Sequence, residues 1–151
     1  MVYMEFSSLG YSAYDIAKLI IKKYNDENEY ISNLMLQKLL FFVQKNSLKN
    51  NQKLIFNDEF EAWKFGPVIP NVYYKFCHYG ALPIKLKKQE ILIDDEYVKT
   101  IICEEFNRWK GQSPFALVRE SHKSGGSWEK VIKNSLGFRK IIPCNLIYEL
   151  G

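Results

Sequence analysis

The sequence lacks the features that mark secreted and membrane proteins. Its three cysteines, Cys77, Cys103 and Cys144, are odd in number and irregularly spaced, which is no disulfide framework and is typical of a reducing compartment. The N-terminus has no basic segment followed by an apolar block, as a secretory signal would have. The densest apolar run, Leu39 to Val43, is far too short to cross a bilayer. The sequence therefore predicts a cytoplasmic protein without a membrane partner.

The chain also lacks a large excess of positive or negative charge. The chain has 21 lysines and arginines against 17 aspartates and glutamates, a formal net charge of +4, and neither half is strongly charged. Dedicated nucleic-acid binders usually concentrate their basic residues on one face or arm. The nearest such group, Lys85, Lys87 and Lys88, is more typical of a solvated loop. We therefore do not expect this protein to bind nucleic acid.

Motifs for catalysis, metal binding and cofactor binding are missing as well. The chain has no Cys-x-x-Cys, no His-Glu-x-x-His, no P-loop and no Rossmann glycine pattern, so we expect no enzymatic activity, cofactor or metal. One enzymatic alternative stays open, a small hydrolase that pairs Cys77 or Cys103 with His122, because such pairs assemble across a fold. Inert packing is favoured for both thiols, since they fall on or beside apolar faces of expected helices.

The sequence does contain enough apolar material for a packed core. Hydrophobic residues make up 47% and aromatic residues 15% of its 151 residues, which excludes disorder and suits one domain spanning residues 1–151. Apolar residues recur at helical spacing behind capping residues. We predict helices from Ser12 to about Asn25, from Ser32 to about Leu48, from Pro70 to Gly80, from Asp94 to Gly111, from Ser113 to about Ser121, from Ser127 through Ile132 and from Pro143 through Leu150.

We expect β-structure to be minor. Two short apolar segments on either side of Asn57-Asp58 predict a small hairpin, which must lean on the helices to be stable. Residues 91–93 are an ambiguous third segment. The predicted fold class is therefore mainly α, a single compact domain of six or seven helices with one small β-hairpin.

The helix after Ser32 is apolar on two opposite sides. Leu36, Leu39, Leu40 and Val43 form its main face, whereas Leu34, Phe41 and Leu48 recur every seven residues on the other. A helix of this kind is normally central and packed between neighbours. The alternative, in which the second face is an exposed docking stripe, is less common because large apolar side chains are usually buried.

Three sequence stretches carry a resemblance to a known family. The first is Leu36-Gln37-Lys38-Leu39-Leu40-Phe41-Phe42, and the second is Glu61-Ala62-Trp63-Lys64-Phe65-Gly66-Pro67-Val68, followed by Tyr73 and by His78-Tyr79-Gly80. The third is Ser121-His122 with Trp128 six residues further on. In this order and at this spacing they resemble the Panacea domain of SocA-like antitoxins, over residues 12 to about 132. Ser121 stands where the family usually has threonine, which keeps the hydroxyl.

The resemblance implies a mostly α domain that neutralises a cognate toxin by direct contact. In at least one branch of the family it implies an adaptor that delivers the toxin to an ATP-dependent protease. Members also occur as phage-associated or mobile-element proteins, so a regulator without a toxin is an alternative. Some relatives carry an added DNA-binding module, for which this chain has no separate segment, so we do not expect promoter binding.

The motif residues are candidates for partner binding, and each also has a structural interpretation. The candidates are Gln37, Lys38, Glu61, Trp63, Gly66, Pro67, Tyr73, His122 and Trp128. We expect Leu39, Leu40, Phe42, Trp63 and Trp128 in the core, and Gly66-Pro67 in a required turn. The polar residues Gln37, Lys38, Glu61 and His122 need partners, so they either hydrogen-bond with each other or line a shared cleft. Exposed aromatic anchors for a partner are expected among Tyr3, Phe6, Tyr30 and Phe138.

Overall fold

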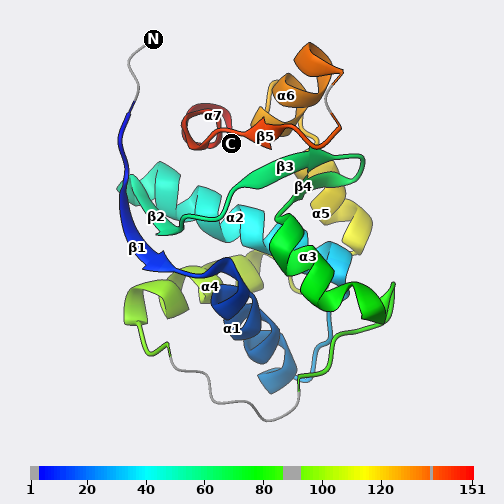
Figure 1. Cartoon of the computed structure of the whole chain (residues 1–151). Coiled ribbons are helices and arrows are strands. Elements are labelled where there is room, and N and C mark those ends of the chain that lie inside the picture. The colour runs from blue at the N-terminus through cyan, green and yellow to red at the C-terminus, as the bar shows by residue number, and fades with distance from the viewer. Residues whose placement is uncertain (1–3, 87–92, 137) are drawn as a thin grey trace.

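The computed structural model describes residues 4–86, 93–136 and 138–151 of the chain. Within these ranges the fold is mainly α, as the sequence predicts, with short strands between the helices (Figure 1). The ambiguous segment at 91–93, apart from Ile93, and the lysines at 87 and 88 lie outside the described residues. The elements in chain order are β1 (Ser7–Tyr11), α1 (Ala13–Asp26), α2 (Asn33–Asn51), β2 (Lys53–Phe56), β3 (Phe60–Trp63), β4 (Gly66–Val68), α3 (Pro70–Phe76), the 3-10 helix η1 (Cys77–Tyr79), α4 (Glu96–Trp109), α5 (Pro114–Ser121), α6 (Ser127–Ser135), β5 (Ile141–Ile142) and α7 (Cys144–Leu150).

The helix starts follow the capping signals closely. Serine side chains cap three helices by accepting a backbone N–H, namely Ser12 for α1, Ser32 for α2 and Ser113 for α5. Two predicted caps are displaced by one residue. Asp95, not Asp94, accepts the N–H of Val98 at the start of α4, and Gly126 takes the cap position that we predicted for Ser127.

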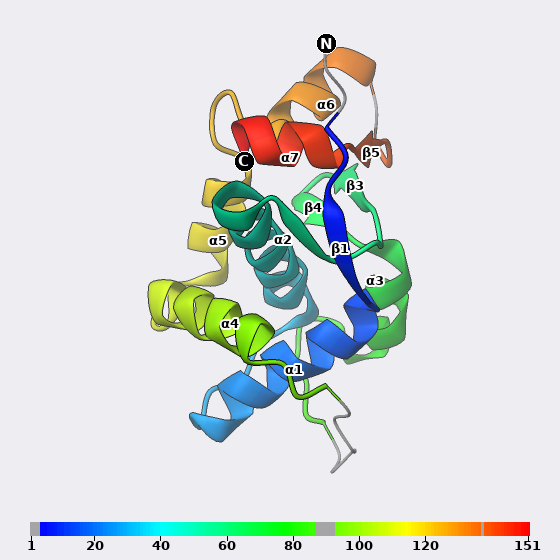
Figure 2. The ribbon, with the colours of Figure 1, turned by 90° about the vertical axis from the view of Figure 1, so that its left-hand side faces the viewer.

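α2 runs through the middle of the molecule, as its two apolar sides predict (Figure 2). It contacts α1, α3, α4, α5, α7, β2 and β4. Its side chains are buried on both sides, with Leu36 and Leu40 on one and Phe41 and Leu48 on the other all at most 1% exposed. The prediction of central burial is therefore confirmed, with Leu34 at the first turn only half-buried. Of the described helices, none is both long and apolar enough to cross a membrane.

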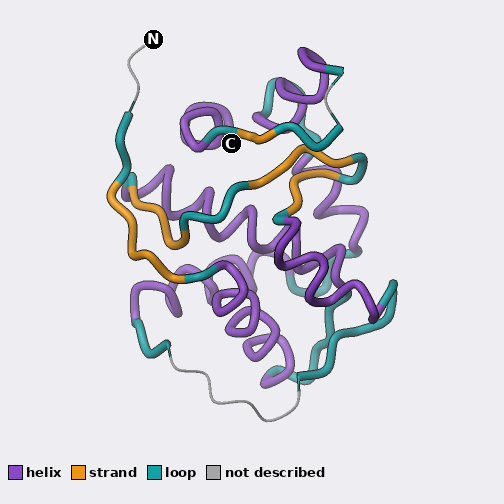
Figure 3. The backbone as a smooth tube through the Cα atoms, viewed as in Figure 1, coloured by secondary structure: helices purple, strands orange, loops and turns teal. Residues whose placement is uncertain are grey.

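The strands form two small sheets that lie apart (Figure 3). β1 pairs with β2 in parallel, and β3 lies between β4 and β5 with antiparallel pairing to each. The predicted hairpin around Asn57-Asp58 is therefore wrong, since β2 and β3 belong to different sheets. The edge of β2 that could have paired with β3 is taken by the side chain of Gln44. The hairpin forms one strand later, where the two-residue loop Lys64-Phe65 joins β3 to β4.

Candidate functional site

Two polar side chains of α2 occupy the free edge of β4. The Gln37 side-chain oxygen accepts the Ile69 N–H at 3.0 Å, and the Lys38 ammonium donates to the Pro67 carbonyl at 2.7 Å. Gln37 also donates to Asn33 at 3.1 Å, which holds its amide in place. Backbone groups at a buried edge must find partners, and here a helix supplies them instead of another strand.

Gln44, two helical turns after Gln37, likewise forms hydrogen bonds with backbone groups of a strand, here β2. Its amide nitrogen donates to the Phe56 carbonyl at 2.7 Å, and its oxygen accepts the Ile55 N–H at 2.8 Å. The amide thus satisfies one backbone donor and one backbone acceptor of β2. Spacing of seven residues places Gln37 and Gln44 on one side of α2, so this helix seals an edge in each sheet.

Lys38 is completely buried, and desolvation lowers its pKa from 10.5 to about 7. Gly66 makes room for it. A Cβ at Gly66 would lie 2.8 Å from the Lys38 Cε and 2.6 Å from the Ser121 hydroxyl oxygen. Gly66 also has φ +116, a conformation that side-chain-bearing residues rarely adopt. The glycine of the motif is therefore required by both space and backbone conformation.

Trp63, Trp128 and His122 connect the hairpin to the C-terminal helices. The Trp128 indole N–H donates to the Trp63 carbonyl at 2.8 Å, and the His122 ring stacks flat on the Trp128 ring at 3.7 Å. Burial, followed by the charge of Lys38, lowers the pKa of His122, whereas a hydrogen bond with the Phe65 backbone acts to raise it. The imidazole is thus held as a packing surface between the helices and the hairpin.

The structure brings all the predicted motif residues together around the β3–β4 hairpin. The four polar residues do not bond with one another among the described contacts. Gln37 and Lys38 bond to backbone groups, Glu61 accepts the Trp63 indole N–H at 3.0 Å, and His122 stacks on a ring. Gln37 additionally lines the groove described below. Leu39, Leu40 and Phe42 are buried as expected, but Trp63 and Trp128 are only half-buried.

Aromatic side chains gather on the outer surface of the same hairpin. Phe65, Tyr74 and Phe138 are 56%, 52% and 57% exposed, and Trp63 and Tyr73 are half-buried. Phe65 lines one surface hollow together with Trp63, Tyr73 and Phe138. The Trp63 ring centroid is 5.0 Å from that of Tyr73, 6.3 Å from that of Tyr74 and 6.0 Å from that of Phe138. We call these five residues the aromatic cluster. Exposed aromatic rings in contact with each other are typical of protein-binding surfaces.

A groove of about 430 Å³ opens beside the aromatic cluster, between the first turns of α2, the hairpin loop and α3. Its apolar walls are formed by Leu34, Trp63, Phe65, Val68, Tyr73 and Phe138. We call it the apolar groove. A concave apolar surface with aromatic walls can receive an apolar side chain of a partner, the usual anchor of a tight interface.

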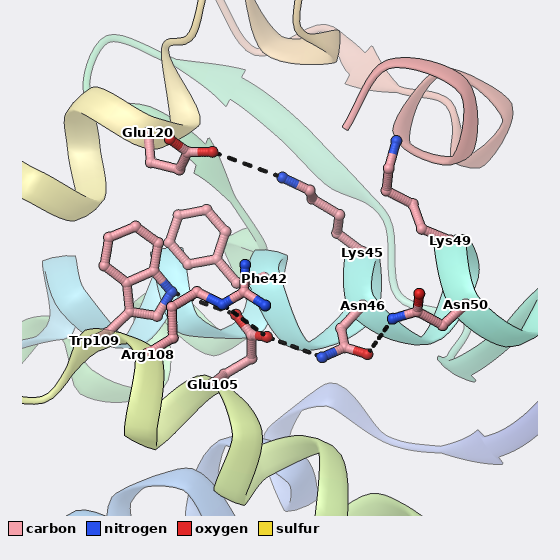
Figure 4. A pocket seen from close by; sticks show the side chains of 9 residues that line it. All are labelled: Phe42, Lys45, Asn46, Lys49, Asn50, Glu105, Arg108, Trp109 and Glu120. Atoms are coloured by element: carbon pink, nitrogen blue, oxygen red, sulfur yellow. Dashed lines mark hydrogen bonds and ion pairs between the residues drawn. The ribbon is translucent and has the colours of Figure 1, made fainter.

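A second cavity, of about 240 Å³, is polar and lies between α2, α4 and α5 (Figure 4). At its base Glu105, which is 4% exposed, accepts hydrogen bonds from Asn46 at 2.9 Å and the Trp109 indole at 3.3 Å. Arg108 approaches the same carboxylate at 3.7 Å, and Lys45 lies 4.0 Å from Glu120. The basic side chains Arg108 and Lys45 thus pair with acidic side chains of the same chain. We therefore interpret this cavity as a feature of helix packing.

The two thiols of the hydrolase alternative make contacts away from His122. Cys77 is exposed, contrary to its expected burial, and donates to the Tyr74 carbonyl at 3.2 Å. Cys103 is half-buried and accepts from Asn107 at 3.7 Å. One face of the His122 ring stacks on Trp128, and its Nε2 atom is buried without a hydrogen-bond partner among the described residues. This arrangement does not favour a nucleophile and base working together.

Sequence reasoning found only part of the exposed aromatic surface. Phe138 and Tyr30 are more than half exposed, as expected, whereas Phe6 is half-buried against Tyr148 and Tyr3 lies outside the described residues. Phe65 and Tyr74 were missed. The signal for Phe65 was available, because a residue directly before Gly66-Pro67 at a hairpin tip has no core to enter.

Two comparisons relate the chain to known proteins. The family described as "Antitoxin SocA-like, Panacea domain" matches residues 36–129, which include the α2 motif, the hairpin and Trp128. A protein named Antitoxin SocA, from Caulobacter vibrioides (strain NA1000 / CB15N), is 36% identical over 133 residues, covering 81% of this chain and 70% of that protein. No solved structure matches the chain. The chain therefore belongs to the SocA-like antitoxin family that is defined by the Panacea domain.

Proposed function

We propose that this protein neutralises a cognate toxin by binding it directly, and that the aromatic cluster and the apolar groove form the centre of the contact. One observation carries this proposal. Three aromatic side chains, Phe65, Tyr74 and Phe138, are each more than half exposed. Tyr74 and Phe138 both contact the Trp63 ring, and Phe65 lines the apolar groove together with Trp63 and Phe138. Membership in the antitoxin family supports a toxin as the partner.

The surface has the chemistry that tight binding needs. Neutralising a lethal protein calls for a dissociation constant on the order of nanomolar, about −12 kcal/mol. A few aromatic anchors in a desolvated centre supply most of the energy of such interfaces. Trp63 and Tyr73 are already fixed by ring contacts within the cluster, so they lose little conformational freedom on binding.

The same binding step can serve an adaptor. We propose that the bound toxin is then passed to an ATP-dependent protease in the cytoplasm, so that neutralisation ends in degradation. This second step is separable from the first. The half-life of the toxin in cells with and without the protein, measured in a host and in a strain lacking the protease, distinguishes an adaptor from a simple inhibitor.

The proposal is tested with the product of the gene directly beside the one encoding this chain. Expression of that product alone should arrest growth, and co-expression of this protein should restore it. Calorimetry with the two purified proteins should give a one-to-one complex of nanomolar affinity. A neighbouring product that is harmless, or that neither binds nor is rescued, would contradict the proposal and favour a regulator without a toxin.

A further inference from the structure

We infer that the apolar groove receives an acidic segment of the partner protein, in which an aromatic or aliphatic anchor is flanked by aspartate or glutamate. This inference rests on the proposed function, since it specifies the chemistry of the partner at the same surface. The charges around the groove support this chemistry.

Two cations lie over the rings at the rim of the groove. The Arg139 guanidinium sits 4.7 Å from the Trp63 ring centroid and 5.4 Å from that of Phe138, and the Lys64 ammonium sits 5.5 Å from that of Phe65. Both side chains are exposed, and within the described part of the chain neither forms an ion pair. They differ in this from Arg108 and Lys45 of the polar cavity, which face carboxylates of the same chain.

No acidic side chain is among the described residues that line the groove. Among the described residues that line it, Lys64 is the one charged side chain. The nearest carboxylate on the hairpin, Glu61, accepts the Trp63 indole N–H at 3.0 Å and is half-buried. A partner segment in this groove therefore meets apolar walls, with two positive charges at the rim that have no ion-pair partner within the described part of the chain. Complementarity then requires an apolar anchor with acidic neighbours.

The turn that carries Phe138 and Arg139 is held in place by β3. The Arg139 N–H donates to the Ala62 carbonyl at 2.8 Å, and the Ala62 N–H donates to the Lys140 carbonyl at 2.8 Å. Arg139 itself has φ +75, in the left-handed region that residues other than glycine adopt infrequently. Such a conformation persists where surrounding bonds impose it. The guanidinium is thus positioned over the rings before any partner arrives, which lowers the entropy lost on binding.

The test is a peptide selection that does not use the toxin. A random twelve-residue peptide library is displayed on phage and selected on the full chain at low salt. Enriched peptides are then measured against the wild type, against the double variant Lys64→Glu/Arg139→Glu, and against Lys130→Glu as a control. Lys130 is an exposed lysine on α6, so this control makes the same kind of charge reversal away from the groove.

We expect enriched peptides to combine an aromatic or aliphatic residue with aspartate or glutamate. Their affinity should fall at least about tenfold for the double variant, since like charges then face each other, and should stay unchanged for Lys130→Glu. Basic or uncharged peptides, no enrichment, or equal binding to the double variant would overturn the inference. A toxin that still binds in any of those cases would leave the proposed function intact, because the two tests share no ligand.

Discussion

The two sides of the β3–β4 hairpin differ in what their side chains contact. Polar side chains on the inner side bond to the protein's own backbone, whereas aromatic side chains on the outer side are exposed. On the inner side, Gln37 accepts the Ile69 N–H and Lys38 donates to the Pro67 carbonyl at the edge of β4. On the outer side, the rings of Phe65 and Phe138 and the Arg139 guanidinium make ring and cation–π contacts at the rim of the groove. On the inner side Gln37 and Lys38 have hydrogen-bond partners within the chain, and among the described residues His122 Nε2 is a buried atom without one. On the outer side, exposed aromatic rings lie beside two cations that form no ion pair within the described part of the chain.

This difference separates the family motif from the binding surface. Gln37, Lys38, Gly66, Pro67, His122 and Trp128 mainly fix the hairpin against α2 and the C-terminal helices. Phe65, Tyr74, Phe138 and Arg139 stand on that scaffold and are free to contact another protein. Substitutions on the inner side should therefore act on stability, and substitutions on the outer side should act on binding.

The largest expected effect is that of Gly66→Ala on the inner side. A Cβ at this position meets the Ser121 hydroxyl oxygen at 2.6 Å and the Lys38 Cε at 2.8 Å, and φ is +116. Strain and overpacking together should lower the free energy of unfolding by roughly 2–6 kcal/mol. Urea unfolding measures this, with Gly111→Ala as the control, because Gly111 also has positive φ but a Cβ added there would meet no atom within 4 Å. An equal loss in both variants would show that crowding at Gly66 is unimportant.

Gln44→Leu should follow in size. The substitution leaves the Ile55 N–H and the Phe56 carbonyl without partners in a buried setting. Each unsatisfied group costs about 1–3 kcal/mol, so the two together should lower the free energy of unfolding by roughly 2–6 kcal/mol, and burial of the leucine side chain offsets part of this loss. The matched control is Gln112→Leu, at an exposed position, which should change the unfolding midpoint little. Retained stability in Gln44→Leu would mean that α2 does not seal β2.

The lowered pKa of Lys38, on the inner side, predicts that the stability of the fold depends on pH. Its pKa is about 7 in the folded chain and 10.5 when exposed, so between these values the unfolded chain binds the proton and the folded chain does not. Stability should therefore rise with pH, by up to about 1.4 kcal/mol per pH unit. The useful window is pH 7 to 8.5, below the range in which the raised pKa of Cys144 begins to oppose the trend. Denaturant unfolding should show a steeper rise in the wild type than in Lys38→Met, which keeps the smaller contribution of Lys45, and identical slopes would refute the prediction.

Phe138→Ala should have the smallest effect on stability, because the side chain is 57% exposed. The expected change in the free energy of unfolding is within about 0.5 kcal/mol. Binding to the toxin should nevertheless weaken by about 2 kcal/mol, as for a central aromatic anchor. Phe115→Ala is the control, since Phe115 is 74% exposed on α5 and does not line the groove. Equal affinities for the two variants would place the contact elsewhere.

Local signals explain how much of this fold could be predicted from the sequence. The caps Ser12, Ser32 and Ser113 and the two apolar sides of α2 depend on neighbouring residues, and the structure confirms them. The hairpin was misplaced because strand pairing depends on what else reaches the edge of a strand. Nothing near Asn57-Asp58 indicates that Gln44 occupies the edge of β2.

The candidate site was predicted as a set of residues but not as an arrangement. The motif indicated that Gln37, Lys38 and Trp63 belong together, yet it could not show that the first two face inward. Arg139 and Phe138 reach the Trp63 ring only because β5 and the preceding turn fold back onto β3. Contacts between residues about 75 positions apart have no signature in a single sequence, so the rim of the groove became visible only in the fold.

The most direct test of the account is calorimetric titration of the neighbouring gene's toxin into wild type and into Phe65→Ala/Phe138→Ala, together with the unfolding midpoint of each. Our account predicts an affinity loss of at least about tenfold with an unchanged midpoint, because both rings are more than half exposed. Undiminished affinity, or a loss that merely follows a lowered midpoint, would contradict the claim that the outer face of the hairpin binds the partner.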